Sequence, residues 1–338
     1  MDIFNDDAFS VRRLTDAINE IEFVPGRISE LGLFEAESTD VTIIQVEKKG
    51  DILVLVPPTP RGAPGTTLDK NKADLRPLSV PHFELNDAVY AEEVQNKRAF
   101  GREMQLESLV MKIAERQRIM VRSFAATEEH ARMGAVQGIV VYADGSTLNL
   151  FTEFGVSQIA EIDFDLDNAN PVDGVLRKQC SGLVRTVSAE LKGLPFTGLR
   201  AFCGDNFFDD LLSHPEVRET YKGWSEAQIL RDSYTSPNKS IYGSFDFGGI
   251  RWENYRGATG GAAFVHTDKC HIFPEGVPGL FRTVYSPADY EETVNTMGER
   301  LYSRQYAMQN GKGRNLDAQM NALQYCTRPR VLLKGKRT

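Results

Sequence analysis

The chain has 338 residues, of which 41% are hydrophobic and 25% are charged, and its formal net charge is −8. These values are typical of a folded globular protein with one large or two medium domains. No run approaches the about 18 consecutive apolar residues of a membrane-spanning helix, and MDIFNDDAFSVRR at the start has no signal-peptide layout. We therefore expect a protein of a cytosol-like compartment, with free cysteines and no general affinity for nucleic acid.

The first third of the chain predicts projections rather than a compact core. Residues 9–34 predict an arm with a helical turn or two around Leu14 to Ile21, whose few apolar side chains must dock on another surface. Residues 41–56 contain two β-rich runs around KKGD, which is a hairpin signal. The stretch 57–83 that follows holds six of the 15 prolines, so we expect a projecting loop. Its basic residues are Arg61, Lys70, Lys72 and Arg76.

A single long helix is expected next, from Arg102 to Met133, because this stretch has neither glycine nor proline. Apolar residues recur along it at helical spacing and predict one buried face: Leu106, Val110, Ile113, Met120 and Phe124. Residues 138–150 predict a hairpin with Asp144-Gly145 in a type I′ turn. From about Asn170, helices and strands alternate and predict a mixed α/β domain, with Asp205 as a helix N-cap.

The stretch HTDKCHIFPEG, residues 266–276, places two histidines and a cysteine within six residues and resembles a zinc site. Side chains alternate along a strand, however, so Cys270 and His271 are expected on opposite faces. No second ligand pair lies nearby in the sequence. An ordinary strand ending in a turn is the favoured interpretation, and we expect no metal and no cofactor.

Three other patterns suggest sites without meeting their requirements. EIDFDLDNANPVDG, residues 161–174, lacks the glycine and glutamate of a calcium loop, and its alternation favours a half-buried strand. GATGGAAF, residues 257–264, lacks the lysine of a phosphate-binding loop, and GSFDFGG, residues 243–249, does not fit a serine nucleophile elbow. The sequence therefore predicts no enzyme. Arms and loops that cannot be buried within one chain indicate an assembly protein instead.

The sequence also resembles the lambda-type phage major capsid protein E family from about Leu14 to Leu333. The resemblance rests on FVPGRISELGLFE followed by PPTPRGAPG, and later on GLFRTVYSPADYEETVNTMGERLYSRQ followed by NALQYCTRPRVL. It implies the α+β Hong Kong 97-type capsid fold, with an N-terminal arm (1–38) and an extended loop (39–85). A peripheral domain (86–169) with spine helix 102–133, an axial domain (170–320) and a returning C-terminal strand (321–338) would follow.

As a member of this family, the protein would be the major head protein of a tailed bacteriophage, a shell component that is not an enzyme. It would form pentamers and hexamers of an icosahedral shell around double-stranded DNA, assembled in the host cytoplasm and found in the virion. Expected partners are further copies, a scaffolding protein, a portal and a decoration protein, with no membrane. We expect Arg61, Lys70, Lys72 and Arg76 to contact an acidic surface of a neighbouring subunit.

Two alternatives stay open at this point. An encapsulin-type compartment would have the same fold but enclose proteins, whereas a soluble metal-dependent enzyme would depend on the HTDKCH cluster alone. Some capsids of this fold join a loop lysine to an asparagine of a neighbour by an isopeptide bond. For Lys70 and Lys72 we expect solvation and charge contacts instead.

Overall fold

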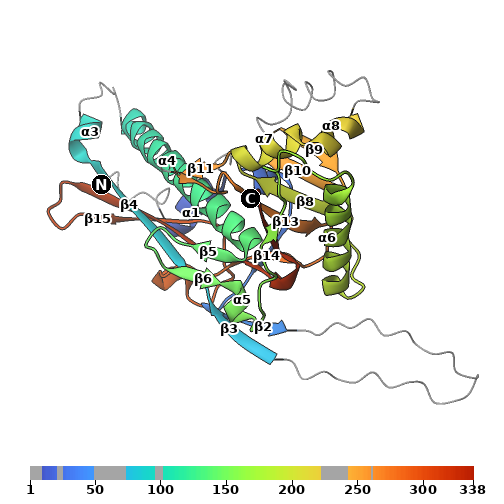
Figure 1. The fold of residues 1–338 in the computed structure, drawn as a ribbon. Coiled ribbons are helices and arrows are strands. Elements are labelled where there is room, and N and C mark those ends of the chain that lie inside the picture. Colours follow the sequence, from blue (N-terminus) through green and yellow to red (C-terminus); the bar gives the residue numbers. More distant parts are fainter. Residues whose placement is uncertain (1–9, 21–25, 49–73, 96–101, 222–242, 260–261) are drawn as a thin grey trace, which may run out of the picture. The chain divides into compact units, whose positions relative to one another are not determined.

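The computed structural model describes residues 10–20, 26–48, 74–95, 102–221, 243–259 and 262–338 (Figure 1). The chain divides into two compact units, each assembled from stretches far apart in the sequence. The first unit comprises Met1–Gln45, Pro77–Glu129 and Arg282–Gln324, and the second comprises Val46–Arg76, His130–Phe281 and Tyr325–Thr338. Both contain helices and strands, in agreement with the predicted α+β class.

The first unit is built on a five-stranded sheet in the order β1-β14-β16-β15, with β4 also paired to β16. The central strand, β16, is antiparallel to both β15 and β4. The elements of this unit are α1 (Val11–Glu20), α2 (Arg27–Glu30), β1 (Phe34–Ser38), β4 (His82–Tyr90), α3 (Ala91–Gln95), α4 (Arg102–Gln137, continuing into the second unit), β14 (Phe281–Tyr285), the 3₁₀ turn Glu291–Thr293, β15 (Tyr302–Ala307) and β16 (Gly313–Cys326).

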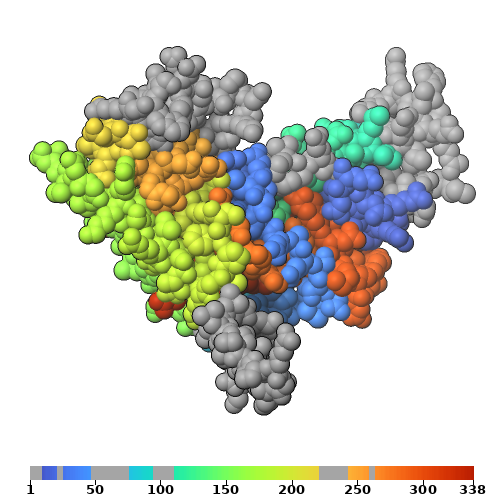
Figure 2. Space-filling model, turned by 90° about the vertical axis from the view of Figure 1, so that its right-hand side faces the viewer, coloured from blue at the N-terminus to red at the C-terminus, as the bar shows by residue number. Residues whose placement is uncertain are grey.

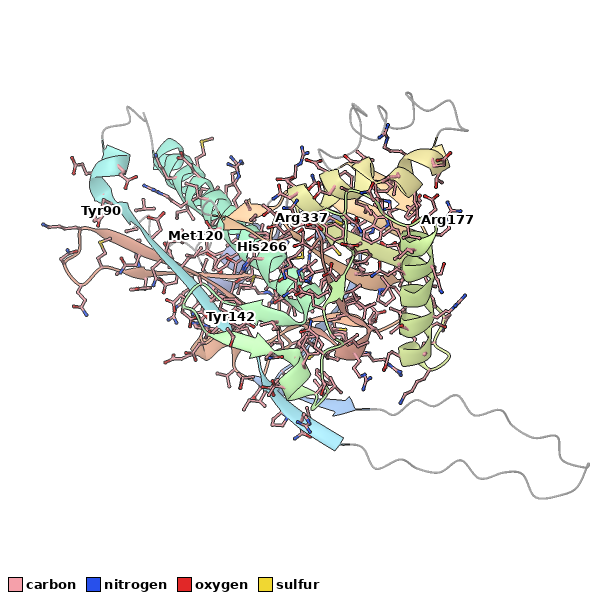
Figure 3. The ribbon with its side chains drawn as sticks, viewed as in Figure 1. Tyr90, Met120, Tyr142, Arg177, His266 and Arg337 are labelled. Atoms are coloured by element: carbon pink, nitrogen blue, oxygen red, sulfur yellow. The ribbon has the colours of Figure 1, made fainter. Side chains whose placement is uncertain are left out.

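One face of this sheet carries the core of the unit. Leu316, Ala318 and Met320 alternate along β16, so their side chains leave the same face. They form one buried cluster with residues of α1 and α4, among them Met120, and Figure 3 labels Met120 on α4. Leu14 of α1 belongs to the same cluster. The apolar side of the predicted arm helix is therefore buried within its own unit, and no neighbouring copy is needed to cover it.

Helix α4 continues four residues beyond the predicted end at Met133. Gly134 does not stop the helix; a Cβ there would lie 2.7 Å from the Cα of Val140, so glycine permits close packing against the following hairpin. Gly138, with φ +84°, ends the helix, because its left-handed conformation suits the position after a helix C-terminus.

The second unit contains a six-stranded mixed sheet in the order β7-β17-β13-β8-β10-β9. Strand β8 is parallel to β10 and antiparallel to β13. The elements are β5 (Ile139–Val141), β6 (Thr147–Asn149), α5 (Leu150–Glu153), β7 (Ile162–Asp163), α6 (Val175–Leu191), β8 (Gly198–Cys203), α7 (Asp205–Ser213), α8 (Pro215–Tyr221), β9 (Ser244–Phe247), β10 (Ile250–Asn254), β11 (Ala258–Thr259), β12 (Ala262–Ala263), β13 (Lys269–Glu275), the 3₁₀ turn Pro329–Val331 and β17 (Leu333–Lys336).

Two local predictions in this unit are corrected by backbone geometry. In the β5–β6 hairpin the Gly145 N–H donates to the Tyr142 carbonyl at 3.0 Å, and Gly145 has positive φ while Asp144 has not. The turn is thus a three-residue loop ending in a left-handed glycine, not a two-residue type I′ turn. The N-cap of α7 is Gly204, and Asp205 is the first helical residue.

The strand pairing also differs from the expected segment boundaries. Strand β17 pairs with β13 and β7 in the second unit, so only the part of 321–338 up to Cys326 joins the sheet of the first unit. Residues 282–320, expected with the 170–320 segment, belong to the first unit. Pairing between strands that are far apart in the sequence decides which sheet β17 joins and which unit contains residues 282–320. Periodicity within one segment carries no information about such pairing.

The strands flanking the predicted loop pair with each other. Strand β2 (Ile43–Lys48) pairs with β3 (Asp74–Ser79) in a separate two-stranded sheet. The first of the two β-rich runs in 41–56 is thus a strand, whereas the second run lies outside the described residues. Within the part of the chain that the structure describes, no helix is both long and apolar enough to cross a membrane.

The close packing around Gly204 gives a first prediction. A Cβ at Gly204 would lie 2.2 Å from the carbonyl oxygen of His266 and 2.5 Å from the Cα of Thr267, so backbone would have to move. We expect Gly204→Ala to lower the free energy of unfolding by about 1–3 kcal/mol, measured by urea denaturation. Gly198→Ala, in the strand β8 that precedes Gly204, meets no atom within 4 Å and is the matched control, with a change below about 1 kcal/mol. Equal effects of the two substitutions would contradict the packing argument.

Candidate assembly surfaces

A carboxylate of α4 holds the short helix α2, which contains part of the FVPGRISELGLFE stretch. Buried Glu129 accepts hydrogen bonds from the backbone N–H of Ile28 at 2.7 Å and from the hydroxyl of Ser29 at 3.1 Å. The N-cap residue Gly26 has no side chain to bind these donors. A Cβ at Gly26 would lie 2.2 Å from the Glu129 carboxyl carbon, so glycine leaves room for the carboxylate. Glu129 therefore replaces the missing N-cap.

The neighbouring Glu128 binds the stretch that follows β14. It accepts hydrogen bonds from the hydroxyl of Tyr285 at 2.7 Å and from the guanidinium of Arg300, whose Nη2 lies at 2.8 Å. The Glu128 side chain is 1% exposed, so its carboxylate is shielded from water, while Arg300 is partly exposed. Two adjacent residues of one helix thus hold two segments that are more than 250 residues apart in the sequence, Ile28–Ser29 and Tyr285–Arg300.

The arm helix α1 is fixed by polar contacts as well as by its apolar face. The Asn19 amide donates to the Leu301 carbonyl at 2.9 Å, and Thr15 Oγ1 accepts from the Ser303 N–H at 3.2 Å. Gln117 of α4 donates to the Leu14 carbonyl at 3.3 Å and to the Ser303 hydroxyl at 3.1 Å. Described arm residues therefore form part of the folded unit.

The basic residues predicted to contact a neighbour are mostly outside the described part of the chain. Arg61, Lys70 and Lys72 fall within residues 49–73, which the structure does not describe. Arg76 lies in β3 and is partly buried, and a Cβ at Gly155 would lie 3.1 Å from its Nη2. Their role at a subunit interface stays a prediction.

The HTDKCH cluster does not converge on one point. His266, labelled in Figure 3, lies in the turn before β13 with its side chain 65% exposed. Cys270 is buried and lies opposite Cys203 of the neighbouring strand β8. The side chain of His271, the next residue, points to the other face of β13. Burial lowers the pKa of His271 to about 3, so its imidazole is neutral at pH 7. Across the described ranges no three His, Cys, Asp or Glu side chains form a group that could hold a metal.

The acidic and glycine-rich patterns also have structural roles. Phe164 and Leu166 are buried while Asp163, Asp165 and Asp167 are exposed, as the alternation predicted, although the strand itself covers only Ile162–Asp163. GSFDFGG forms β9 and the turn into β10. GATGGAAF contains the β11–β12 pair, and its residues 260–261 lie outside the described residues.

A buried ion network that the sequence analysis missed lies in the second sheet. Arg200 of β8 donates to Glu253 of β10, which is fully buried, and to Glu275 of β13 at 2.5 Å. The three residues come from adjacent strands, and only the pairing register brings them together. The Arg200 guanidinium thus lies between two carboxylates inside the unit. Each strand alone shows no sign of the network, because the partners are 53 and 75 residues from Arg200.

A second buried polar site lies on the face of β16 opposite to Leu316, Ala318 and Met320. Asp317 is 8% exposed, and its Oδ1 has no hydrogen-bond partner among the described residues. Burial, with the charge of Glu84 adding to it, raises the pKa of Asp317 to about 6, while Arg304 opposes the shift. Asp317 is therefore an acid whose proton state changes near neutral pH.

The comparisons with known proteins give the family. The model of the phage major capsid protein E family matches residues 10–337. The chain belongs to this family. It is similar to the major capsid protein of Pseudomonas phage KPP10, with 28% identity over 97% of each chain. It is also similar to the major capsid protein of Salmonella phage Felix O1, with 27% identity over 95% of each chain.

A solved structure supports the fold. The crystal structure described as a candidate capsid protein of a prophage of E. coli CFT073 superposes with a TM-score of 0.58, covering 97% of this chain and 99% of that one. Identity is 12%, so this likeness concerns the fold alone. The predicted family and the Hong Kong 97-type capsid fold are confirmed, and the chain is a major capsid protein of the tailed-phage type.

The Glu129 contact gives a second prediction. Glu129→Ala removes the acceptor of the first N–H groups of α2 and leaves them unsatisfied, which costs about 1–3 kcal/mol of the free energy of unfolding. We also expect faster amide hydrogen exchange in residues 27–30. Glu115→Ala is the control on the same helix, since Glu115 is exposed and forms a surface ion pair with Lys112. Unchanged exchange in 27–30 would show that Glu129 does not hold α2.

Asp317 gives a prediction for pH. Its pKa is about 6 in the folded unit and about 4 in an unfolded chain, so the folded state binds the proton more tightly. The free energy of unfolding therefore falls as the pH rises from about 4 to about 6. Asp317→Asn should remove this slope and stabilise the subunit at pH 7 by on the order of 1 kcal/mol, measured by urea denaturation at several pH values. Asp16→Asn on the exposed side of α1 is the control, and an unchanged slope in Asp317→Asn would contradict the assignment.

Proposed function

We propose that copies of this chain assemble as pentamers and hexamers into a closed icosahedral shell that encloses double-stranded DNA. The observation that carries the proposal is the family match over residues 10–337, nearly the whole chain. The match covers residues of both units. The shell role therefore extends to both units.

Within the shell, we assign the first unit to the peripheral part and the second to the axial part. The support is architectural: the first unit packs the long helix α4 on a sheet, and the second packs α6 and α7 on a mixed sheet. Residues 39–85 would project as the extended loop. Arg61, Lys70, Lys72 and Arg76 would bind an acidic surface on an adjacent subunit, where opposite charges favour docking in one register.

The charge of the chain suits a container. With a net charge of −8 the shell wall would not bind packaged phosphate backbones tightly, and DNA could enter and leave. We assign the protein no catalytic step, because the histidine and cysteine residues that suggested one are divided between a turn and two faces of a strand. A scaffolding protein, a portal and a decoration protein are proposed partners during assembly in the host cytoplasm.

Electron microscopy of the purified full-length chain tests this function. We expect closed shells or capsomer rings, and nucleic acid in shells purified from phage-producing cells. Small monodisperse particles under every condition would refute the proposal. Shells that hold protein cargo instead of DNA would favour an encapsulin-type compartment.

The same assay tests the loop. Replacing Arg61, Lys70 and Lys72 with serine should abolish closed shells and leave folded subunits with an unchanged melting temperature, because the contacts removed lie between subunits. Arg76→Ser is examined separately, since Arg76 lies in β3 and its loss can also affect the subunit. Normal shells from the triple variant would show that these loop charges have no role in closure.

A further inference from the structure

Helix α6 has two faces of opposite character. The face toward the sheet is buried and apolar, with Leu176, Cys180, Leu183, Val187 and Leu191. The opposite face carries Lys178, Arg185 and Lys192, all exposed. Lys178 and Arg185 are seven residues apart, close to two helical turns, so their side chains leave the helix in nearly the same direction. Lys192 follows the last helical residue as the left-handed C-cap. We call these three residues the α6 cationic face.

The three cations have no ion-pair partner in the described part of the chain. The neighbouring Arg177, labelled in Figure 3, shows the contrast: it donates to the hydroxyl of Thr220 at 2.8 Å and lies over the ring of Phe247. In Figure 2, α6, in yellow-green, lies on the surface turned toward the viewer. The α6 cationic face is thus accessible to another molecule.

The surface between the cations is bare. Ser181, Gly182 and Ala189 occupy it, all small residues at positions between Lys178 and Lys192. Glycine destabilises a helix interior relative to alanine, and a Cβ at Gly182 would meet no atom within 4 Å. Packing against the described residues therefore gives no reason for glycine here. A second surface that approaches α6 closely would give one.

The same unit contains a surface of opposite charge around the end of the C-terminal strand. Lys336 pairs with Asp163 at 2.8 Å, and Arg337 binds Asp210 at 2.6 Å and Asp268 at 2.9 Å. Hydrogen bonds from Lys336 and from Asn206 lower the pKa of Asp163 and Asp268, respectively, so both carboxylates are ionised. With two further exposed carboxylates, the acidic edge consists of Asp163, Asp165, Asp167, Asp210 and Asp268. Beside this edge Glu161 pairs with Lys269 at 2.6 Å and with Lys334 at 3.5 Å. Counted together, six carboxylates face four cations, Lys269, Lys334, Lys336 and Arg337, so the surface stays acidic.

We propose that the α6 cationic face docks against the acidic edge of a second copy of the chain. The inference rests on the proposed self-assembly and assigns one of its contacts. Three like charges cannot face a copy of themselves without repulsion, so a symmetric contact of α6 with α6 is disfavoured. The contact joins two different surfaces, and repeated contacts of this head-to-tail kind close into rings when the rotation between copies allows it.

Nucleic acid is the competing occupant of a cationic helix face. The net charge of −8 and the presence of only three cations on this face oppose it, because phosphate binding gains affinity from many neutralised charges. The bare surface around Gly182 also suits a closely packed protein contact better than a phosphate backbone. We therefore assign the face to a second copy, and DNA content becomes part of the test.

The test uses charge reversal and restoration in the full-length chain. Lys178→Glu, Arg185→Glu and Lys192→Glu together should lower the yield of rings and shells at least tenfold while leaving the melting temperature within a few degrees of wild type. Adding Asp165→Lys and Asp167→Lys should restore assembly, since these two carboxylates have no ion pair among the described residues. Gly182→Trp should also block assembly, and Gly182→Ala, which adds a single Cβ, should lower the yield of shells by less.

Other results of these assembly assays would overturn the contact, its occupant or the proposed function. Normal shells from the reversal variant, or no recovery in the combined variant, would overturn the contact. Normal shells that have lost their DNA would reassign the face to nucleic acid. Failure of the wild-type chain to assemble would overturn the proposed function and the contact with it, and the wild-type control distinguishes this result from failure of the contact alone.

Discussion

Two adjacent carboxylates in the C-terminal third of α4 hold the first unit together. The unit consists of three stretches separated by more than 30 and 150 residues, and closing such loops costs entropy that local structure cannot repay. Glu128 and Glu129 each bind a different remote stretch, the one after β14 and the one at α2. Both side chains are buried, so losing a partner would leave an unsatisfied charge inside the unit. Long-range order is therefore coupled to the satisfaction of these two groups.

The second unit also joins segments that are far apart in the sequence, and there a buried ion network does so. Arg200 lies between Glu253 and Glu275, so buried charges from neighbouring strands are paired where each alone would be costly. Replacement of such networks by apolar residues often stabilises a protein, so stability alone is a weak reason for their presence. A wrong strand register would separate the partners, which means that the network opposes alternative pairings of β8, β10 and β13.

Sequence reasoning succeeded where the signal is local. The absence of glycine and proline from Arg102 to Met133 predicted α4, and the alternation at Asp163–Asp167 predicted which side chains are buried. It failed where the answer depends on distant partners. The position of β17 in the second sheet, the Arg200 network and the contacts of Glu128 and Glu129 all join residues that lie far apart in the sequence. The N-cap error at Asp205 has the same cause, since the backbone of His266 and Thr267 leaves Gly204 no room for a side chain.

The electrostatics of the second unit connect the fold to assembly. A net charge of −8 describes the chain as a whole, but the cations of α6 and the carboxylates around Arg337 are separated into distinct surfaces. Exposed ion pairs are individually weak and are screened by salt. A subunit that must find its place in a closed array benefits from this weakness, because misplaced contacts can dissociate before the array closes. Repetition of the same weak contact in every copy then supplies the stability that one contact lacks.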